Sequence, residues 1–330
     1  MNKKVFPIIA TAILLMSAGL TSCEYKDLDD PSILSTVTLE FDTRNVEQIP
    51  TAIRAVFYPA DQYTMSNMTM GYTIFDCPNV SSDSIWKAKC MIPAGKYYIT
   101  TYNNDTGNIL VEQMNDRENI KATSLEYARG HQEKPSVIDS IYNNQLVLDC
   151  PDYMVHAVAN NYHEIEIETG ESKTIKIFPD SMVVKVNFKL KEIKGLDWVR
   201  ECRGSLNNVA GKRYITPDNV TEDSVAVMFD CEFNAEENAV YGSFYVFGLY
   251  PSNSTIVLSH KMVMYFWMNK GQVFLPIDVT EIINKAGREG NDVTIEINNL
   301  DINLKDYVSS PNTFDINVDE WTDVNVEVGF

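Results

Sequence analysis

Apolar and polar residues alternate with a period of two along most of the chain. In one run, Val37, Leu39 and Phe41 alternate with Thr38 and Glu40. The same alternation recurs in six further segments: Trp86–Ile92, Glu164–Glu168, Val184–Leu190, Val225–Cys231, Val293–Ile297 and Val324–Val328. Successive side chains of a strand point to opposite faces of a sheet, so each segment predicts a half-buried strand.

The segments between these strands are rich in Asn, Asp, Gly and Pro, which is typical of β-sandwiches. Helical signals are few. Thr280 fits an N-cap for a short helix over Glu281–Ala286, and Gly287 fits its end. A second short helix is expected near Asp116–Ala128. We therefore predict a mainly β protein with few short helices.

The N-terminus has the pattern of an export signal. Lys3 and Lys4 precede an apolar stretch from Val5 to Leu20, which is shorter than the ~20 apolar residues that a membrane span needs. A basic start, an apolar middle and a small-residue cleavage site are typical of secretory signals. The stretch ends in Leu-Thr-Ser-Cys, which resembles the lipobox of bacterial lipoproteins. We expect cleavage between Ser22 and Cys23 and lipidation of Cys23.

An acidic segment follows the predicted cleavage site. Glu24–Asp30 contains four acidic residues and one Lys and leads to Pro31, so it has too little apolar area to fold and predicts a solvated tether. It resembles the signal that exports Bacteroidetes-type lipoproteins to the outer face of the outer membrane. Cleavage after residue 22 removes two Lys, which changes the formal charge from −19 to −21. This charge argues against nucleic acid as a partner.

The length of the mature chain suggests two domains. Removing 22 of 330 residues leaves 308, more than a single hydrophobic core usually serves. The turn-forming sequence Thr-Gly-Glu-Ser at 169–172 is the predicted junction. The expected organisation is a signal peptide over 1–22, a tether over 23–35, an N-terminal β-sandwich over 36–170 and a C-terminal β-sandwich over 171–330.

Residues with catalytic or metal-binding chemistry are scarce. The four histidines do not have metal-ligand spacings with Cys or with one another: His131, His156, His163 and His260. Nucleophile-elbow, phosphate-loop and dinucleotide motifs are missing as well. Paired carboxylates of a glycosidase stay open, although most Glu residues fall on predicted wet faces. We expect no enzyme activity, no cofactor and no metal, and we interpret His156 as a hydrogen-bonded strand residue.

Five cysteines remain besides Cys23. An odd number does not indicate a disulfide framework. Cys77 and Cys150 each lie in the sequence Asp-Cys-Pro, so one bridge between them stays open. Buried free thiols are the preferred interpretation, because free Cys behaves as a small hydrophobe.

Several motifs resemble a known family. Val37–Asp42, Ala55–Pro59 and Ile92–Asp105 are similar to the N-terminal domain of Bacteroides-type surface lipoproteins, and these resemble the anchor subunits of Bacteroidales fimbriae in the fimbrillin-like group. The second half of the chain matches more loosely, at Val183–Leu190, Tyr241–Leu249 and Asp278–Ile283. The resemblance implies two tandem transthyretin-like sandwiches that anchor or cap a surface fimbria.

The resemblance also implies partners and a location. An extended segment of one subunit would complete the sheet of another, through main-chain hydrogen bonds. The expected partners are fimbrial shaft or accessory subunits and the lipid bilayer, which acyl chains on Cys23 would enter. The expected location is the outer membrane, facing the cell exterior. The alternative is a free-standing surface lipoprotein that binds glycans or host proteins through loops with aromatic residues such as Tyr63.

The sequence also bears on two kinds of processing, O-glycosylation and cleavage after an Arg. Four Asp-Ser-apolar sequences resemble the O-glycosylation acceptor of Bacteroidetes-type bacteria, at Ser84, Ser140, Ser181 and Ser224. Asp-Ser is also a common turn pair at the start of a strand. Shaft subunits of the fimbrillin-like group lose their first strand by cleavage after an Arg, and Arg44 follows the first predicted strand here. We expect no cleavage at Arg44, because an anchor must keep both that strand and its lipid.

Overall fold

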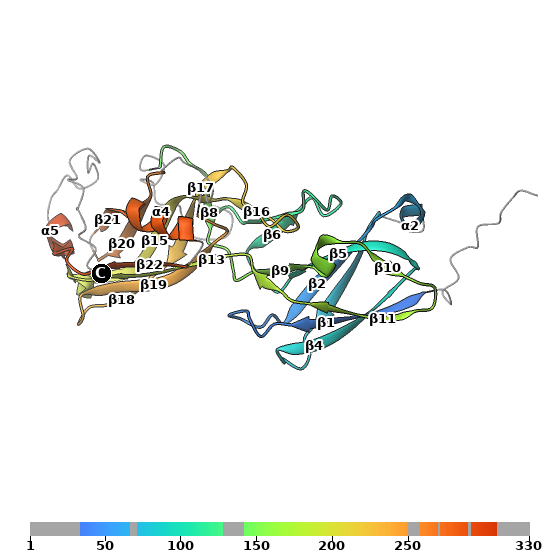
Figure 1. The fold of residues 1–330 in the computed structure, drawn as a ribbon. Helices are drawn as coiled ribbons and strands as arrows, with labels where there is room; N and C mark the ends of the chain where they lie inside the picture. Colours follow the sequence, from blue (N-terminus) through green and yellow to red (C-terminus); the bar gives the residue numbers. More distant parts are fainter. Residues whose placement is uncertain are drawn as a thin grey trace, which may run out of the picture.

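The predicted strands form an elongated molecule with two lobes (Figure 1). The computed structural model describes residues 34–66, 71–127, 142–249, 258–269, 271–289 and 292–308. Most strands of the first half of the chain gather at one end of the molecule, which we call the N-terminal lobe, and most of those of the second half at the other end, the C-terminal lobe. The described chain is mainly β and its helices are short, which confirms the predicted fold class.

The first sheet of the N-terminal lobe has β1 (Ser35–Asp42) at its centre. β1 runs antiparallel to β4 (Ile85–Ile92) and parallel to β11 (Ser172–Ile177). The strand order of the second sheet is β12-β9-β5-β2-β3, with β10 also paired to β5. Its strands are β2 (Ala52–Pro59), β3 (Thr73–Pro78), β5 (Gly95–Asn103), β9 (Val155–Val158), β10 (Ile165–Ile167) and β12 (Asp180–Ser181).

The apolar faces of these two sheets form the core of the N-terminal lobe. Val37, Leu39 and Phe41 of β1 are all 0% exposed, so the period-two pattern does mark the buried face. The Phe41 ring stacks on Trp86 of β4 with 4.4 Å between the ring centroids. Burial of each such side chain contributes about 1.5–3 kcal/mol to stability, so β1 is a main support of this lobe.

The C-terminal lobe also has two larger sheets, with strand orders β18-β19-β13-β22 and β21-β20-β15-β17-β8. The first contains β18 (Glu232–Asn234), β19 (Ala239–Val246), β13 (Val184–Leu190) and β22 (Val293–Ile297). The second contains β21 (Gly271–Asp278), β20 (Lys261–Met268), β15 (Val199–Ala210), β17 (Ser224–Asp230) and β8 (Val147–Asp149).

Aromatic rings fill the space between the sheets of the C-terminal lobe. Phe229 of β17 stacks on Phe244 of β19 at 3.8 Å between centroids, and Phe188 of β13 packs beside both. Gly204 of β15 makes room for this cluster, since a Cβ atom there would lie 2.1 Å from Phe229 Cε2. The Phe229 ring therefore lies over Gly204 of the neighbouring strand in its own sheet and contacts Phe244 of the other sheet.

Shorter elements complete the fold. A three-stranded sheet has the order β16 (Lys212–Tyr214), β7 (Lys121–Ser124) and β6 (Ile109–Glu112), and β14 (Ile193–Lys194) pairs with β23 (Ile302–Asn303). The helical segments are α2 (Gln62–Ser66), η3 (Ala159–Tyr162), η4 (Leu196–Trp198), α4 (Thr280–Glu289) and α5 (Leu304–Val308).

Most local predictions agree with these elements. The runs that begin at Val37, Trp86, Glu164, Val184, Val225 and Val293 correspond to β1, β4, β10, β13, β17 and β22. The helix after Thr280 is confirmed as α4, although it continues past Gly287 to Glu289. The helix expected near Asp116–Ala128 is wrong, because Lys121–Ser124 is held as a strand between β6 and β16. Val324–Val328 lie outside the described residues.

The strand pairing changes lobe later than the predicted junction at 170 and 171. β10 and β11 flank Gly170, and both pair with strands of the N-terminal lobe, β5 and β1 respectively. The Thr-Gly-Glu-Ser sequence does form a turn, with Gly170 at φ +70°. This turn connects the two sheets of one lobe and is not a linker. By strand pairing, the last change of lobe lies between β12 and β13, and the chain also enters the C-terminal lobe earlier, at β8, which pairs with β17.

Candidate functional site

The junction between the lobes has an apolar cluster of its own. Val56, Tyr58 and Tyr102 come from β2 and β5, whereas Ile215 and Phe247 come from segments of the C-terminal lobe. All five side chains are buried. We call this cluster, together with the polar contacts around it, the junction. Because apolar area is removed from water here, the two lobes are not independent units on a free linker.

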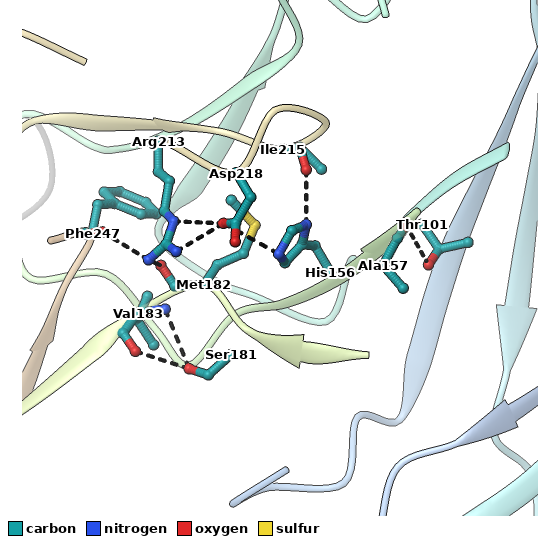
Figure 2. A network of polar contacts seen from close by, with 10 residues as sticks. All are labelled: Thr101, His156, Ala157, Ser181, Met182, Val183, Arg213, Ile215, Asp218 and Phe247. Atoms are coloured by element: carbon teal, nitrogen blue, oxygen red, sulfur yellow. Dashed lines mark hydrogen bonds and ion pairs between the residues drawn. The ribbon is translucent and has the colours of Figure 1, made fainter. Parts of the chain in front are cut away.

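A charged network lies against this cluster. Figure 2 shows the Asp218 carboxylate between the Arg213 side chain of β16 and the His156 ring of β9. Arg213 Nε donates to Asp218 Oδ1 at 2.8 Å, and His156 Nε2 lies 3.3 Å from the same oxygen. Arg213 Nη1 also donates to the backbone carbonyls of Met182 and Phe247, at 3.0 and 3.3 Å. The Arg213 guanidinium thus links Asp218 to Met182, between β12 and β13, and to Phe247, which follows β19.

Each ring nitrogen of His156 lies close to an acceptor oxygen. His156 is 7% exposed, and its Nδ1 lies 2.7 Å from the carbonyl oxygen of Ile215. The carbonyl and the Asp218 carboxylate are both acceptors, so the ring donates to both only when both nitrogens carry a proton. This arrangement agrees with the expectation of a hydrogen-bonded strand histidine. It joins β9 of the N-terminal lobe to the loop after β16.

Asp218 stays ionised in this setting. Burial by itself would raise the pKa of the Asp218 carboxyl, but the hydrogen bonds and charges of His156 and Arg213 together hold it below its ordinary value. About a third of the side chain is exposed, so solvent screens part of this interaction. The network is therefore a structural contact that depends on charge.

A second group of polar contacts crosses the junction on its exposed side. Lys185 of β13 forms an ion pair with Glu47, whose backbone N–H donates to the Tyr153 hydroxyl at 2.9 Å. Gln48 Nε2 donates to the Tyr245 hydroxyl at 3.0 Å. The rings of Tyr153 and Tyr245 lie 5.4 Å apart. Residues 47 and 48, in the loop between β1 and β2, thus contact the C-terminal lobe directly.

Sheet edges are the other candidate functional feature. Among the described strands, β4 has a strand partner on one side only, which is β1. Its eight residues alternate between buried and more exposed positions, and Ile85 and Met91 are exposed by 42% and 56%. An edge strand of this length offers a row of main-chain donors and acceptors to an added strand.

The other long edge in the described sheets is less open. β21 also has eight residues and one strand partner, but it contains Pro276 and packs against α5. Proline cannot donate to a ladder and is a common feature of edges that resist pairing. The edge strands β3 and β11 have six residues, β22 has five, and β8, β12 and β18 have three or fewer. We call β4 the docking edge, because it is long and free of proline.

The predicted site residues fall into two groups. Ser22, Cys23 and Ser140 lie outside the described residues. Ser181 is exposed at the end of β12, whereas Ser84 is half-buried. The Ser224 hydroxyl donates to Asn208 Oδ1 at 2.9 Å and accepts from Gln145 Nε2 at 2.7 Å. The structure does not bring these serines together into one site.

The histidines are also dispersed. His260 is fully buried in the C-terminal lobe, where burial lowers the pKa of its ring, and His163 is exposed after η3. His131 lies outside the described residues, as does the Tyr63 side chain proposed for loop binding. In the part of the chain that the structure describes, no group of three or more His, Cys, Asp or Glu residues could hold a metal ion.

One hollow near the junction could hold a small ligand. It measures about 560 Å³, and its lining includes Tyr127, Asp149, Asp152, Arg203 and Asp230. Small-molecule sites are usually apolar and aromatic with a few polar groups. Here three carboxylates line the hollow, and Tyr127 is only 4% exposed with its hydroxyl bonded to Arg203. The hollow therefore has little aromatic surface for stacking.

The junction network was not predicted from the sequence. Arg213 and Asp218 are five residues apart, but His156 and Phe247 are distant in the chain. Their meeting depends on how the lobes pack, which the period-two pattern does not encode. Asp218 has φ +51°, and its local turn sequence Thr-Pro-Asp-Asn could have indicated a loop but not a network.

Comparison with known proteins identifies the family. Residues 22–230 match the model of a family described as a domain of unknown function, DUF5119, and the chain belongs to this family. No curated protein matches the chain. In the described residues we find no helix with the length and hydrophobicity needed to cross a membrane.

Several solved structures from Bacteroidales are similar to this chain, and one of them, from Bacteroides ovatus, shares its fold. A candidate adhesin of Bacteroides ovatus is 20% identical, with a TM-score of 0.58, and the match covers 86% of this chain and 97% of that one. The fimbrial anchor protein Mfa2 of Porphyromonas gingivalis matches at a TM-score of 0.44 and 9% identity, over 80% of this chain and 90% of Mfa2. A candidate cell adhesion protein of Bacteroides eggerthii matches at 0.45 and 10% identity, over 82% and 88%.

Proposed function

We propose that this protein is a lipid-anchored cell-surface subunit of the fimbrial or adhesin class, with a structural and binding role rather than a catalytic one. The observation that carries the proposal is the fold shared with the Bacteroides ovatus candidate adhesin over 97% of that protein. The Leu-Thr-Ser-Cys sequence at 20–23 supports the anchor. Acyl chains on Cys23 would bury many CH₂ groups, each contributing about 0.8 kcal/mol to membrane binding.

Strand addition is the proposed way in which this subunit meets others. The docking edge β4 offers eight residues of main chain next to β1. An added strand would gain hydrogen bonds to the edge, and its side chains would meet Ile85 and Met91 at the two ends of β4. We also propose that the two lobes are tandem transthyretin-like β-sandwiches.

The alternative function is glycan or host-protein binding through loops by a free-standing lipoprotein. The hollow beside Tyr127 is the described feature that would serve it. Its three carboxylates and nearly covered ring make it a poor sugar platform, so we favour assembly with other subunits. Purification of the intact surface protein, with its partners identified by mass spectrometry, separates the two: fimbrial subunits support the first and their absence supports the second.

The Cys23→Ala substitution tests the anchor. We expect the variant to lose incorporation of a palmitate analogue and to leave the membrane fraction, because the acyl chains have no other site of attachment. Cys150→Ala is the matched control, since that half-buried thiol lies far from the signal sequence. Label that persists in the Cys23 variant would refute the lipidation site.

Ser181 is the acceptor we propose for a glycan. It is exposed, whereas Ser84 is half-buried and the Ser224 hydroxyl has two side-chain partners. A bulky glycan needs an exposed residue. We expect the native protein to be heavier than the lipidated polypeptide and the Ser181→Ala variant to lose that difference. An intact mass equal to that of the lipidated polypeptide would contradict modification at every predicted acceptor.

A further inference from the structure

Two cysteines of the N-terminal lobe meet between its two sheets. Cys77 lies on β3 opposite Ile53 of β2, and Cys90 lies on β4 opposite Val37 of β1. Both side chains point into the same core and are 1% and 0% exposed. β3 packs against β4 in that core, and each of the two thiols shifts the pKa of the other. They are therefore adjacent although they belong to different sheets.

Two cysteines of the C-terminal lobe are cross-strand neighbours. β15 and β17 are antiparallel, and Arg203 lies opposite Asp230. The next step of this register places Cys202 opposite Cys231. Residues opposite each other in an antiparallel pair have Cα atoms about 4.5–5.5 Å apart, within the range of disulfides. Burial and then the Cys202 thiol raise the pKa of Cys231, and both side chains pack in the core of this lobe.

The fifth described cysteine has a different setting. Cys150 lies at the end of β8, among the carboxylates of Asp149, Asp152 and Asp230. Burial and these charges raise the pKa of its thiol to about 12. It packs against the core of the C-terminal lobe, whereas Cys77 lies in the core of the N-terminal lobe. The bridge between Cys77 and Cys150 that the Asp-Cys-Pro sequences left open does not agree with this placement.

We propose that the exported protein carries two disulfides, Cys77–Cys90 and Cys202–Cys231, and one free thiol at Cys150. The proposal rests on the export that the proposed function includes, because disulfides persist in oxidising compartments and are rare in the cytosol. The first bridge would tie the two sheets of the N-terminal lobe together across their core. The second would tie adjacent strands of one sheet.

Each bridge forms by thiol–disulfide exchange with a disulfide-bearing oxidant, either a protein or a small molecule. One thiolate attacks a sulfur of the oxidant, whose S–S bond breaks, and a mixed disulfide forms. The second thiolate then attacks the protein sulfur of the mixed disulfide. The protein loses two protons and two electrons in total and gains one S–S bond, and the oxidant leaves as two thiols.

The Cys77–Cys90 bridge must form before the N-terminal lobe is complete. Because both thiols are almost fully buried in the folded lobe, the oxidant meets them before the two sheets close. The bridge therefore forms during folding.

Peptide mapping tests the pairs directly. Full-length protein from the membrane fraction is denatured with an alkylating reagent and digested without reduction. We expect one linked peptide containing Cys77 and Cys90, one containing Cys202 and Cys231, and alkylation of Cys150. Alkylation of all five cysteines, or a peptide that links Cys77 to Cys150, would overturn the proposal.

Two further samples separate the pairing from the location. Reduced protein refolded in a glutathione redox buffer should form the same two links. Links in the buffer but not in cell-derived protein would overturn both the disulfides in the cell and the export. Surface-exposed protein without links in either sample would overturn the pairing and leave the proposed function standing. Cys90→Ser should leave Cys77 alkylated and the second link intact, and Cys150→Ser should keep both links.

Discussion

Asp218 is the residue whose charge holds the junction network together. It accepts from Arg213 and lies beside His156, so it joins a strand of the N-terminal lobe to a loop of the C-terminal lobe. We predict that Asp218→Asn lowers the free energy of unfolding by about 1 kcal/mol, since a hydrogen bond to a charged group is lost and solvent already screens part of it. Chemical denaturation measures the change.

The pH dependence of this variant gives the sign of the effect. The pKa of Asp218 is lower in the folded protein than its ordinary value of 3.8, so its stabilising contribution is complete above that value. The contribution is lost as the pH falls from 3.8 through the folded pKa. The difference between the wild type and Asp218→Asn should therefore shrink below pH 3.8. The exposed Asp180→Asn variant is the control, and an equal loss there would contradict the network.

Strand β1 is the element on which the N-terminal lobe depends most. It has a strand partner on both sides and buries Val37, Leu39 and Phe41 completely. We predict that Leu39→Ala lowers the free energy of unfolding by about 2–5 kcal/mol, because it leaves a cavity in a packed core. Thr38→Ala, on the other face of the same strand, should change it by about 0.5 kcal/mol or less. Similar losses for both variants would contradict the assignment of faces.

The position of β1 bears on processing of the chain. Arg44 follows β1, and its guanidinium donates to Asp42 at the end of this strand. Cleavage after Arg44 would detach the central strand of the sheet together with the predicted lipid. That the chain stays uncut at Arg44 remains a prediction, and N-terminal sequencing of the membrane-bound protein tests it.

Elements whose pattern is local were predictable from the sequence, and those that depend on distant pairing were not. β1, β4 and β13 each have an alternation that marks their buried face. Lys121–Ser124 was expected in a helix but forms a strand. Its local sequence does not reveal this pairing, because one of its two partners, β16, lies far along the chain. The segment around Gly170 was predicted as a domain junction, and its sequence does not say that the strands on either side pair within one lobe.

At the scale of the whole molecule, the sequence indicated two units but not the contacts between them. Lys185 and Glu47 are 138 residues apart, and their ion pair forms only when the lobes pack together. The candidate site was predictable only in part for the same reason. The lipidation sequence at Cys23 is local, whereas the openness of β4 depends on which strands flank it in the folded sheet.

If the protein is the cell-surface subunit that we propose, another subunit should bind at the docking edge β4. Lys89 lies on β4, directly beside β1, and its side chain is exposed. The Lys189 side chain of β13 is also accessible to solvent, but Lys189 has strand partners on both sides, Tyr241 of β19 and Glu296 of β22. The two positions therefore differ in access to a free edge and not in contact with solvent.

Site-specific photocrosslinking on intact cells tests the central claim most directly. A photoreactive amino acid replaces Lys89 in one variant and Lys189 in the other, and the products are identified by mass spectrometry. We predict that the probe at Lys89 links the protein to another surface subunit and that the probe at Lys189 does not. Equal crosslinking at the two positions, or no protein partner at Lys89, would contradict assembly through the β4 edge.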